Sequence, residues 1–177
     1  MASRYSEVYA AWKADPQGFW SGAADAIDWF ERPQRAFDAE GGTYGHWYAG
    51  GSTNTCYNCL DRHVEAGRGE QIAFIYDSPV TGRVERISYA ALLADVKALA
   101  AVYRGLGVGK GDRIIIYMPM IPQAAVAMLA AARIGAVHSV VFGGFAANEL
   151  AVRIDDCQAK LVVSASCGIE PGRTVAY

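Results

Sequence analysis

The sequence predicts an α/β fold: an open, largely parallel sheet with flanking helices, preceded by an irregular, aromatic-rich helical segment at the N-terminus. Two observations carry this prediction. Residues 111–145 have the pattern of a strand, a helix and a second strand, whereas residues 1–70 show no sustained period. Strands and helices continue to alternate after this stretch, which is typical of a parallel sheet covered by helices.

The strand–helix–strand unit is the centre of the prediction. Residues 112–118 are rich in isoleucine, as expected for a parallel strand that is covered on both faces. Pro122 suits a first helical turn, residues 123–134 are mostly alanine, methionine and leucine, and Gly135 is placed to end the helix. Residues 137–141 form a second β-branched run. The many alanines predict a helix that lies close to the sheet and is covered by another layer.

The first segment, residues 1–70, is predicted to hold two helices and an irregular stretch between them. Apolar side chains at helical spacing predict a helix over residues 5–12, and Pro16 should end it. A second helix is expected from residues 53–54 to residues 67–69. The aromatic side chains of the irregular stretch are Trp20, Trp29, Phe30, Phe37, Trp47 and Tyr48. Such side chains bury large areas, so this segment should pack against a larger body instead of forming its own core.

The second segment, residues 71–177, is predicted to contain the sheet. Residues 72–76 and 83–87 are separated by turn-forming residues and predict a β-hairpin. Ser88 is a good N-cap for the helix that follows. The later elements are a helix over residues 147–157 and a strand over residues 161–164.

Composition excludes several classes of partner. The net charge of -2 gives no general electrostatic reason to bind nucleic acid or an anionic membrane. No apolar stretch reaches spanning length without charge, because Arg113 and Arg133 bracket the longest one. The four cysteines are too few and too scattered for a disulfide framework. We therefore expect a soluble, cytoplasmic protein with reduced thiols.

Three suggestive motifs are better explained as structural. The glycine run at residues 104–111 follows a helix and opens a strand, the reverse of a phosphate loop. Cys56, Cys59 and His63 have zinc-like spacing, but no fourth ligand lies nearby, so ordinary buried cysteines are expected. His138 lies within a predicted strand and is interpreted as a core histidine. We therefore predict no catalytic residue and no metal ligand in this chain.

The loop Phe142-Gly143-Gly144-Phe145 follows the second strand of the central unit, at the edge where open α/β sheets bind ligands. Two glycines allow a ligand to approach the backbone, and the Phe rings offer a stacking face. A plain strand-to-helix turn explains the same residues equally well. Arg173 lies in a predicted flexible loop after the last strand, again at a carboxyl end.

Several stretches together resemble the acetyl/propionyl-CoA synthetases, and the resemblance covers the whole chain. The stretches are Asn54-x-x-x-Asn58-x-Leu60-Asp61-Arg62-His63, Ile87-Ser88-Tyr89-x-x-Leu92, Tyr117-Met118-Pro119, Ala131-x-Arg133-Ile134-Gly135-Ala136-x-His138-x-Val140 and Val141-Phe142-Gly143-Gly144-Phe145. The stretch from Ser166 to Arg173 looks most like the propionyl-CoA synthetase branch.

The resemblance implies an AMP-forming ligase that activates propionate or acetate with ATP and Mg²⁺ and transfers the acyl group from the adenylate to CoA. By this resemblance, residues 1–70 are the family's leader segment and residues 71–177 are the first part of its AMP-binding large domain. The phosphate loop, acyl pocket and catalytic lysine of the family are absent from these residues. The chain is then expected to be an inactive N-terminal fragment that holds no tightly bound cofactor and whose partner is the remainder of its own polypeptide.

The resemblance also suggests where CoA would bind. In acetyl-CoA synthetases the Phe-Gly-Gly loop and two arginines of a later loop lie at the nucleotide end of CoA. Phe142, Gly143 and Gly144 match the loop, and Arg173 matches the second arginine. Glu170 stands where those enzymes have the first arginine, and a carboxylate cannot replace it against a phosphate. Two alternatives stay open: a non-catalytic α/β module that binds CoA or another nucleotide, and a structural or interaction fragment.

Overall fold

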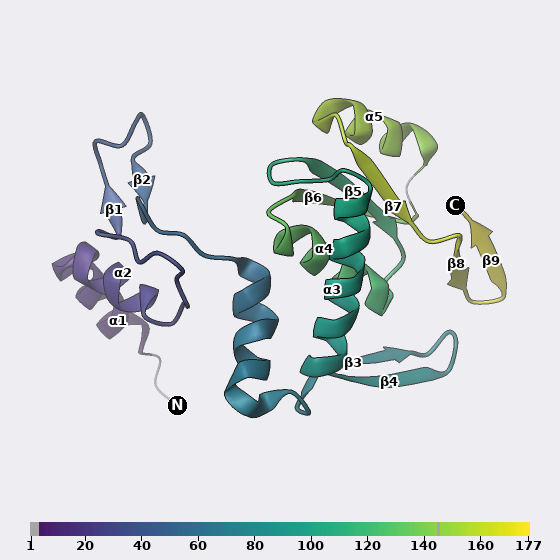
Figure 1. Ribbon diagram of the computed structural model, residues 1–177, viewed down its shortest axis with the longest axis horizontal. Coiled ribbons are helices and arrows are strands. Elements are labelled where there is room, and N and C mark those ends of the chain that lie inside the picture. The colour runs from purple at the N-terminus through teal and green to yellow at the C-terminus, as the bar shows by residue number, and fades with distance from the viewer. Residues whose placement is uncertain (1–3, 145) are drawn as a thin grey trace. The chain divides into compact units, whose positions relative to one another are not determined.

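A computed structural model describes residues 4–144 and 146–177, so Phe145 lies outside the described residues. The chain divides into two compact units, one ending at Thr53 and the other beginning at Asn54 (Figure 1). The predicted division near residue 70 stays a prediction. Among the described residues, no helix is both long enough and apolar enough to cross a membrane.

The first unit contains helices α1 (Tyr5–Ala14) and α2 (Pro16–Ala24) and the two-residue strands β1 (Phe37–Asp38) and β2 (His46–Trp47). The end of the first helix before Pro16 is confirmed. The expectation of irregular chain directly after it is wrong, because Asp15 and Pro16 also start α2. The Asp15 carboxylate accepts a hydrogen bond from the Gly18 N–H at 2.9 Å, and Pro16 occupies the first turn.

Aromatic contacts hold the rest of the first unit together. The ring of Trp47 lies 4.9 Å from that of Phe37 and 5.6 Å from that of Trp20, centroid to centroid. Among the described residues of this unit, the buried hydrophobic side chains are Ala24 and Ala36. The predicted lack of an independent core of large side chains is therefore confirmed.

A three-stranded parallel sheet forms the centre of the second unit. Its order is β6 (Val137–Phe142), β5 (Arg113–Met118) and β7 (Leu161–Ser164), with β5 in the middle. Ile114, Ile115 and Ile116 of β5 are fully buried, as the β-branched run predicts. The strand–helix–strand prediction is confirmed, because α4 (Pro122–Arg133) connects β5 to its parallel neighbour β6.

Helices cover this sheet (Figure 1). Helix α3 (Tyr89–Gly105) packs along α4, and the Ser88 hydroxyl accepts a hydrogen bond from the Ala91 N–H, which confirms the predicted N-cap. The predicted second layer over α4 is also confirmed, since its alanines 127, 130 and 131 have no exposed surface. The expected helix after Asn54 contains two π-helical segments, η1 (Tyr57–Asp61) and η2 (Val64–Arg68). Helix α5 (Ala147–Cys157) follows β6.

Two hairpins flank the parallel sheet. The predicted pairing of β3 (Ile72–Ser78) with β4 (Arg83–Ser88) is confirmed. The residues after β7, expected to be a flexible loop, instead form a second antiparallel hairpin, β8 (Cys167–Glu170) and β9 (Arg173–Ala176). Gly172 in its turn has a φ of +77°, a conformation that glycine adopts without steric cost.

Candidate functional site

The carboxyl ends of the three parallel strands lie at one edge of the sheet. Met118 at the end of β5 pairs with Phe142 at the end of β6, and Tyr117 pairs with Ser164 at the end of β7. Ligands bind at this edge in open α/β sheets. The structure therefore places the turn Phe142 to Gly144 where the sequence analysis expects it.

The three residues of this turn differ in exposure. The Phe142 side chain is 59% exposed, Gly143 is buried and Gly144 is exposed. The Tyr117 hydroxyl donates a hydrogen bond to the Gly143 carbonyl at 3.4 Å, and the Tyr177 ring lies over Gly143. Of the two glycines, Gly144 is therefore the exposed one, and the Phe142 ring lies against it, since an added Cβ would stand 2.7 Å from Cε1 of Phe142.

Arg173 lies at the start of β9, next to the hairpin turn. Both Nε and Nη2 of Arg173 donate to Oε2 of Glu170, at 2.7 and 2.6 Å. Both side chains are largely exposed, so this ion pair adds little to stability. An anion that binds the Nε–Nη2 edge of the Arg173 guanidinium has to displace the Glu170 carboxylate.

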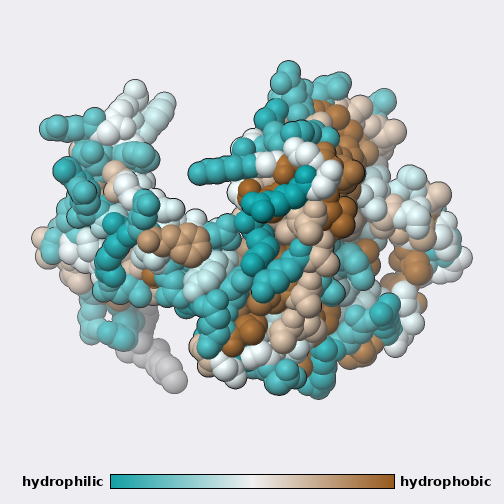
Figure 2. Space-filling view, viewed as in Figure 1, coloured by the Kyte–Doolittle hydropathy of each residue, from teal (hydrophilic) through white to brown (hydrophobic). Residues whose placement is uncertain are grey.

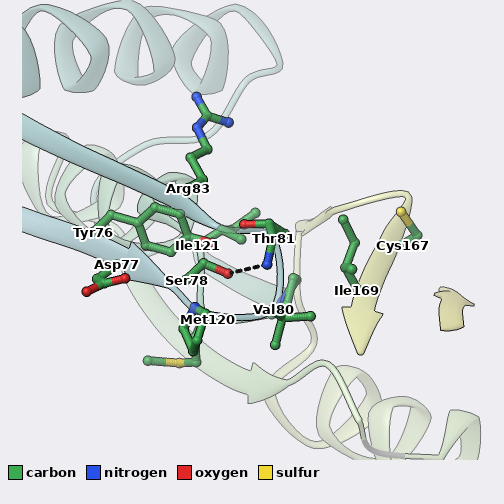
Figure 3. Close-up of a pocket in the computed structure, with 12 residues that line it drawn as sticks. Tyr76, Asp77, Ser78, Val80, Thr81, Arg83, Met120, Ile121, Cys167 and Ile169 are labelled. Atoms are coloured by element: carbon green, nitrogen blue, oxygen red, sulfur yellow. Dashed lines mark hydrogen bonds between the residues drawn. The ribbon is translucent and has the colours of Figure 1, made fainter. Parts of the chain in front are cut away.

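The carboxyl edge also carries a groove of about 480 Å³ that sequence reasoning missed. Figure 3 shows side chains of the β3–β4 hairpin, the residues that follow β5, and Cys167 and Ile169 of β8. Its surface is mainly apolar, and Met120 is 83% exposed. The position of Pro119 to Ile121 directly after a buried strand could have indicated this groove.

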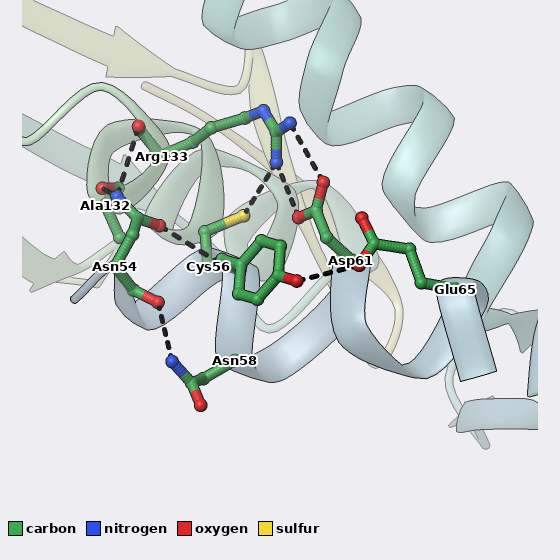
Figure 4. Close-up of polar contacts among 8 residues, drawn as sticks. Asn54, Cys56, Asn58, Asp61, Glu65, Ala132 and Arg133 are labelled. Carbon is green, nitrogen blue, oxygen red and sulfur yellow. Dashed lines mark hydrogen bonds and ion pairs between the residues drawn. The ribbon is translucent and has the colours of Figure 1, made fainter. Parts of the chain in front are cut away.

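A partly buried polar network joins Asn54, Cys56 and Asp61 to the C-terminal end of α4 (Figure 4). Arg133 donates to both carboxylate oxygens of Asp61, at 2.7 and 3.0 Å. The Asn54 side-chain amide donates to the carbonyl oxygens of Ala132 at 2.9 Å and Arg133 at 3.3 Å, at the C-terminus of α4. These contacts fix the helical segment after Asn54 against α4, just before β6.

Cys56 and Cys59 differ in exposure. Cys56 is fully buried, and burial raises the pKa of its thiol although the Arg133 guanidinium, 3.7 Å from Sγ, acts in the opposite direction. The expectation that Cys59 is also buried is wrong, because its side of the helical segment faces solvent. No group of three or more metal-ligating side chains occurs among the described residues.

His138 lies on β6 and is partly buried. Burial lowers the pKa of its imidazole, as expected for a structural histidine in a strand.

Sequence comparison assigns the class of protein. The model of the AMP-binding enzyme family matches residues 60–175, and the model of the acetyl-coenzyme A synthetase N-terminus matches residues 5–59. The chain belongs to the AMP-binding enzyme family.

Similarity to individual proteins extends over almost the whole chain. Over 98% of its length, the chain is 54% identical to an uncharacterized protein of Pseudomonas aeruginosa and 51% identical to the mitochondrial acyl-CoA synthetase short-chain family member 3 of Mus musculus. It is 45% identical to the acetyl-coenzyme A synthetase of Methylorubrum populi. The chain spans about a quarter of these relatives, 28%, 25% and 27% of their respective lengths.

Proposed function

We propose that this chain is the N-terminal part of an AMP-forming short-chain acyl-CoA synthetase that uses propionate or acetate. The observation that carries the proposal is the adjacency of the two family matches, residues 5–59 and residues 60–175, in the order expected of the acetyl-CoA synthetases. The full protein would form an acyl-adenylate from the carboxylate and ATP with Mg²⁺, and CoA would then take the acyl group. Propionate is the preferred substrate in this proposal, because residues 166–173 resemble the propionyl-CoA synthetase branch.

The contribution of this chain to that reaction is binding, not chemistry. The exposed Phe142 ring offers a stacking face for the adenine of CoA, and it lies against the exposed Gly144. Arg173 would exchange the Glu170 carboxylate for a phosphate of CoA, with which a guanidinium makes strong charge-assisted hydrogen bonds. The cytoplasmic location stays a prediction.

The remainder of the polypeptide is the proposed partner. β6 is an edge strand of the described sheet, and its Val137 and Val140 are about half exposed. Figure 2 shows further hydrophobic side chains at the surface of the second unit. An apolar sheet edge of this kind favours pairing with more chain. Self-association of the isolated chain in light scattering, without binding to immobilised CoA, would favour the interaction fragment instead.

A first experiment tests whether the chain is catalytic. Purified residues 1–177, supplied with propionate, ATP, Mg²⁺ and CoA, should release no pyrophosphate above background. Propionate-dependent release would show that the chemistry resides here and would overturn the proposed division of roles.

A second experiment tests the CoA site by calorimetry with two ligands. Arg173→Ala should weaken binding of CoA about tenfold and leave binding of dephospho-CoA, which lacks the 3′-phosphate, nearly unchanged. Arg153→Ala is the matched control, because Arg153 is also paired with a glutamate on the surface, at 3.0 Å. Equal CoA affinity in the wild-type chain and the Arg173→Ala variant would remove Arg173 from the site.

A further inference from the structure

The phenol group of Tyr177 lies against two glycines in different parts of the fold, Gly143 after β6 and Gly168 in β8. A Cβ added to Gly143 would stand 2.6 Å from Cζ of Tyr177, and a Cβ added to Gly168 would stand 2.5 Å from its hydroxyl oxygen. Neither glycine has a positive φ. The backbone conformation would therefore accept alanine at both positions, and the nearest atoms that its Cβ would meet belong to the Tyr177 side chain.

Tyr177 joins the two parts of the candidate site. It follows β9 directly, and its backbone N–H donates to the Ser166 carbonyl, which precedes β8, at 3.3 Å. Its ring lies 5.0 Å from the Tyr117 ring at the end of β5, and the Tyr117 hydroxyl bonds the Gly143 carbonyl. The ring thus connects the β8–β9 hairpin with the turn after β6 and with the central strand.

We infer that Tyr177 is a positioning residue, which docks the β8–β9 hairpin against the turn Phe142 to Gly144 and so sets the spacing between Arg173 and the Phe142 ring. This inference rests on the proposed function, because that spacing matters only if one ligand contacts both. The docking itself is a separate structural statement and can be tested without a ligand.

The pairing of the two hairpin strands explains why docking at Gly168 controls the position of Arg173. Gly168, under the Tyr177 phenol, pairs with Val175, and the Glu170–Arg173 pair lies two positions further along the hairpin. Two strand residues span about 7 Å. A hairpin that is held at Gly168 keeps Arg173 at a fixed place, whereas an undocked hairpin moves Arg173 with it.

The test compares Gly143→Ala, Tyr177→Ala and the double variant in the chain of residues 1–177, with Gly105→Ala as the control. A Cβ at Gly105 meets no atom within 4 Å. Gly143→Ala should displace the Tyr177 side chain, because the atoms in its way belong to a side chain that can rotate. In hydrogen exchange without ligand, Gly143→Ala and Tyr177→Ala should each speed exchange of the β8–β9 amides about tenfold, with the β5 amides and the Gly105→Ala control unchanged.

The double variant separates a shared cause from two independent defects. It should exchange no faster than Tyr177→Ala alone, since the clash needs the phenol to be present. Tyr177→Phe should keep hairpin protection, because the ring that packs on Tyr117 remains. Additive effects in the double variant, or unchanged hairpin exchange in Tyr177→Ala, would overturn the docking role.

Ligand binding tests the functional half of the inference. In calorimetry, Tyr177→Ala should abolish the preference for CoA over dephospho-CoA, and Tyr177→Phe should restore it. Equal weakening of both ligands by Tyr177→Ala would contradict a role in placing Arg173. If the wild-type chain binds neither ligand while the hydrogen-exchange pattern holds, the proposed CoA site fails and the docking of the hairpin stands.

Discussion

The two units of this chain reach order by different means. In the unit that ends at Thr53, half-exposed rings such as Trp47 contact one another, and the buried hydrophobic side chains among its described residues are alanines. In the unit that begins at Asn54, the three isoleucines of β5, residues 114–116, have no exposed surface. Burial of large apolar side chains is what offsets chain entropy. The second unit therefore carries its own core, whereas the described residues of the first unit bury no large apolar side chain completely.

The largest expected effect concerns the buried ion pair of the second unit. Arg133→Ala removes the partner of Asp61, whose side chain is 9% exposed, and leaves an uncompensated carboxylate. We expect the free energy of unfolding to fall by about 3–5 kcal/mol, measured by urea denaturation. The control is Arg35→Ala in the first unit, where Arg35 pairs with Asp38 at the surface and the loss should be under about 1 kcal/mol. Similar losses in both variants would erase the contrast between the units.

The next largest effect is expected from truncating a buried side chain in the second unit. Ile116→Ala in the centre of β5 should lower the free energy of unfolding by about 3 kcal/mol, because it removes a fully buried side chain and leaves a cavity. Ile75→Ala on β3 is the matched control, since that side chain is 53% exposed and should cost well under half as much. A loss that is equal at the two positions would mean that β5 is not the core of the second unit.

A smaller effect is expected from acid. The Lys160 ammonium donates to Asp112 at 2.8 Å and, with the Gly109 N–H, lowers the pKa of that carboxyl. Such a group adds stability above its unfolded pKa of about 3.9 and loses it as the pH falls through the lower folded value. Urea midpoints from about pH 5 to about pH 2 should therefore fall less steeply in Asp112→Asn than in the wild-type chain. Lys160→Gln should also make the urea midpoint fall less steeply over this acid range. If the slope is unchanged in both variants, the Asp112–Lys160 pair does not stabilise the fold.

The smallest expected effect is a gain in stability from a substitution in the core of the second unit. The Tyr103 hydroxyl on α3 is buried and has no hydrogen-bond partner among the described residues, and burial raises its pKa to about 12. Tyr103→Phe removes a polar group whose burial is unfavourable, so the free energy of unfolding should stay equal or rise by up to about 1 kcal/mol. A clear loss of stability in thermal unfolding would indicate a hydrogen bond for this hydroxyl.

Local patterns in the sequence were enough to predict the elements of the second unit from β3 to β7, because these strands and helices each carry a period, a cap or a turn. The cap at Ser88, the covered isoleucine strand and the parallel neighbour of β5 all follow from residues close in sequence. The start of α2 was missed because Pro16 both ends one helix and begins another. The β8–β9 hairpin was missed because its strands are only four residues long and β8 contains glycine and glutamate.

Some features of the candidate site could likewise be predicted from local sequence, and others could not. The place of Phe142 at the carboxyl end of a parallel strand follows from local pattern. The cover that Tyr177 forms over Gly143 depends on a contact between residues distant in the chain, for which no local signal exists. Arg173 was recognised as a cation, but its pairing with Glu170 depends on the hairpin that was not predicted.

The pairing of Arg173 with Glu170 has a kinetic consequence. The hairpin tip presents a neutral couple instead of a lone positive charge, so it generates little long-range field to draw in a phosphate from solution. An incoming anion that replaces Glu170 gains only the difference in free energy between two exposed contacts. In the proposed CoA site, Arg173 would therefore act after encounter: it would lengthen the residence of a bound ligand without raising its association rate.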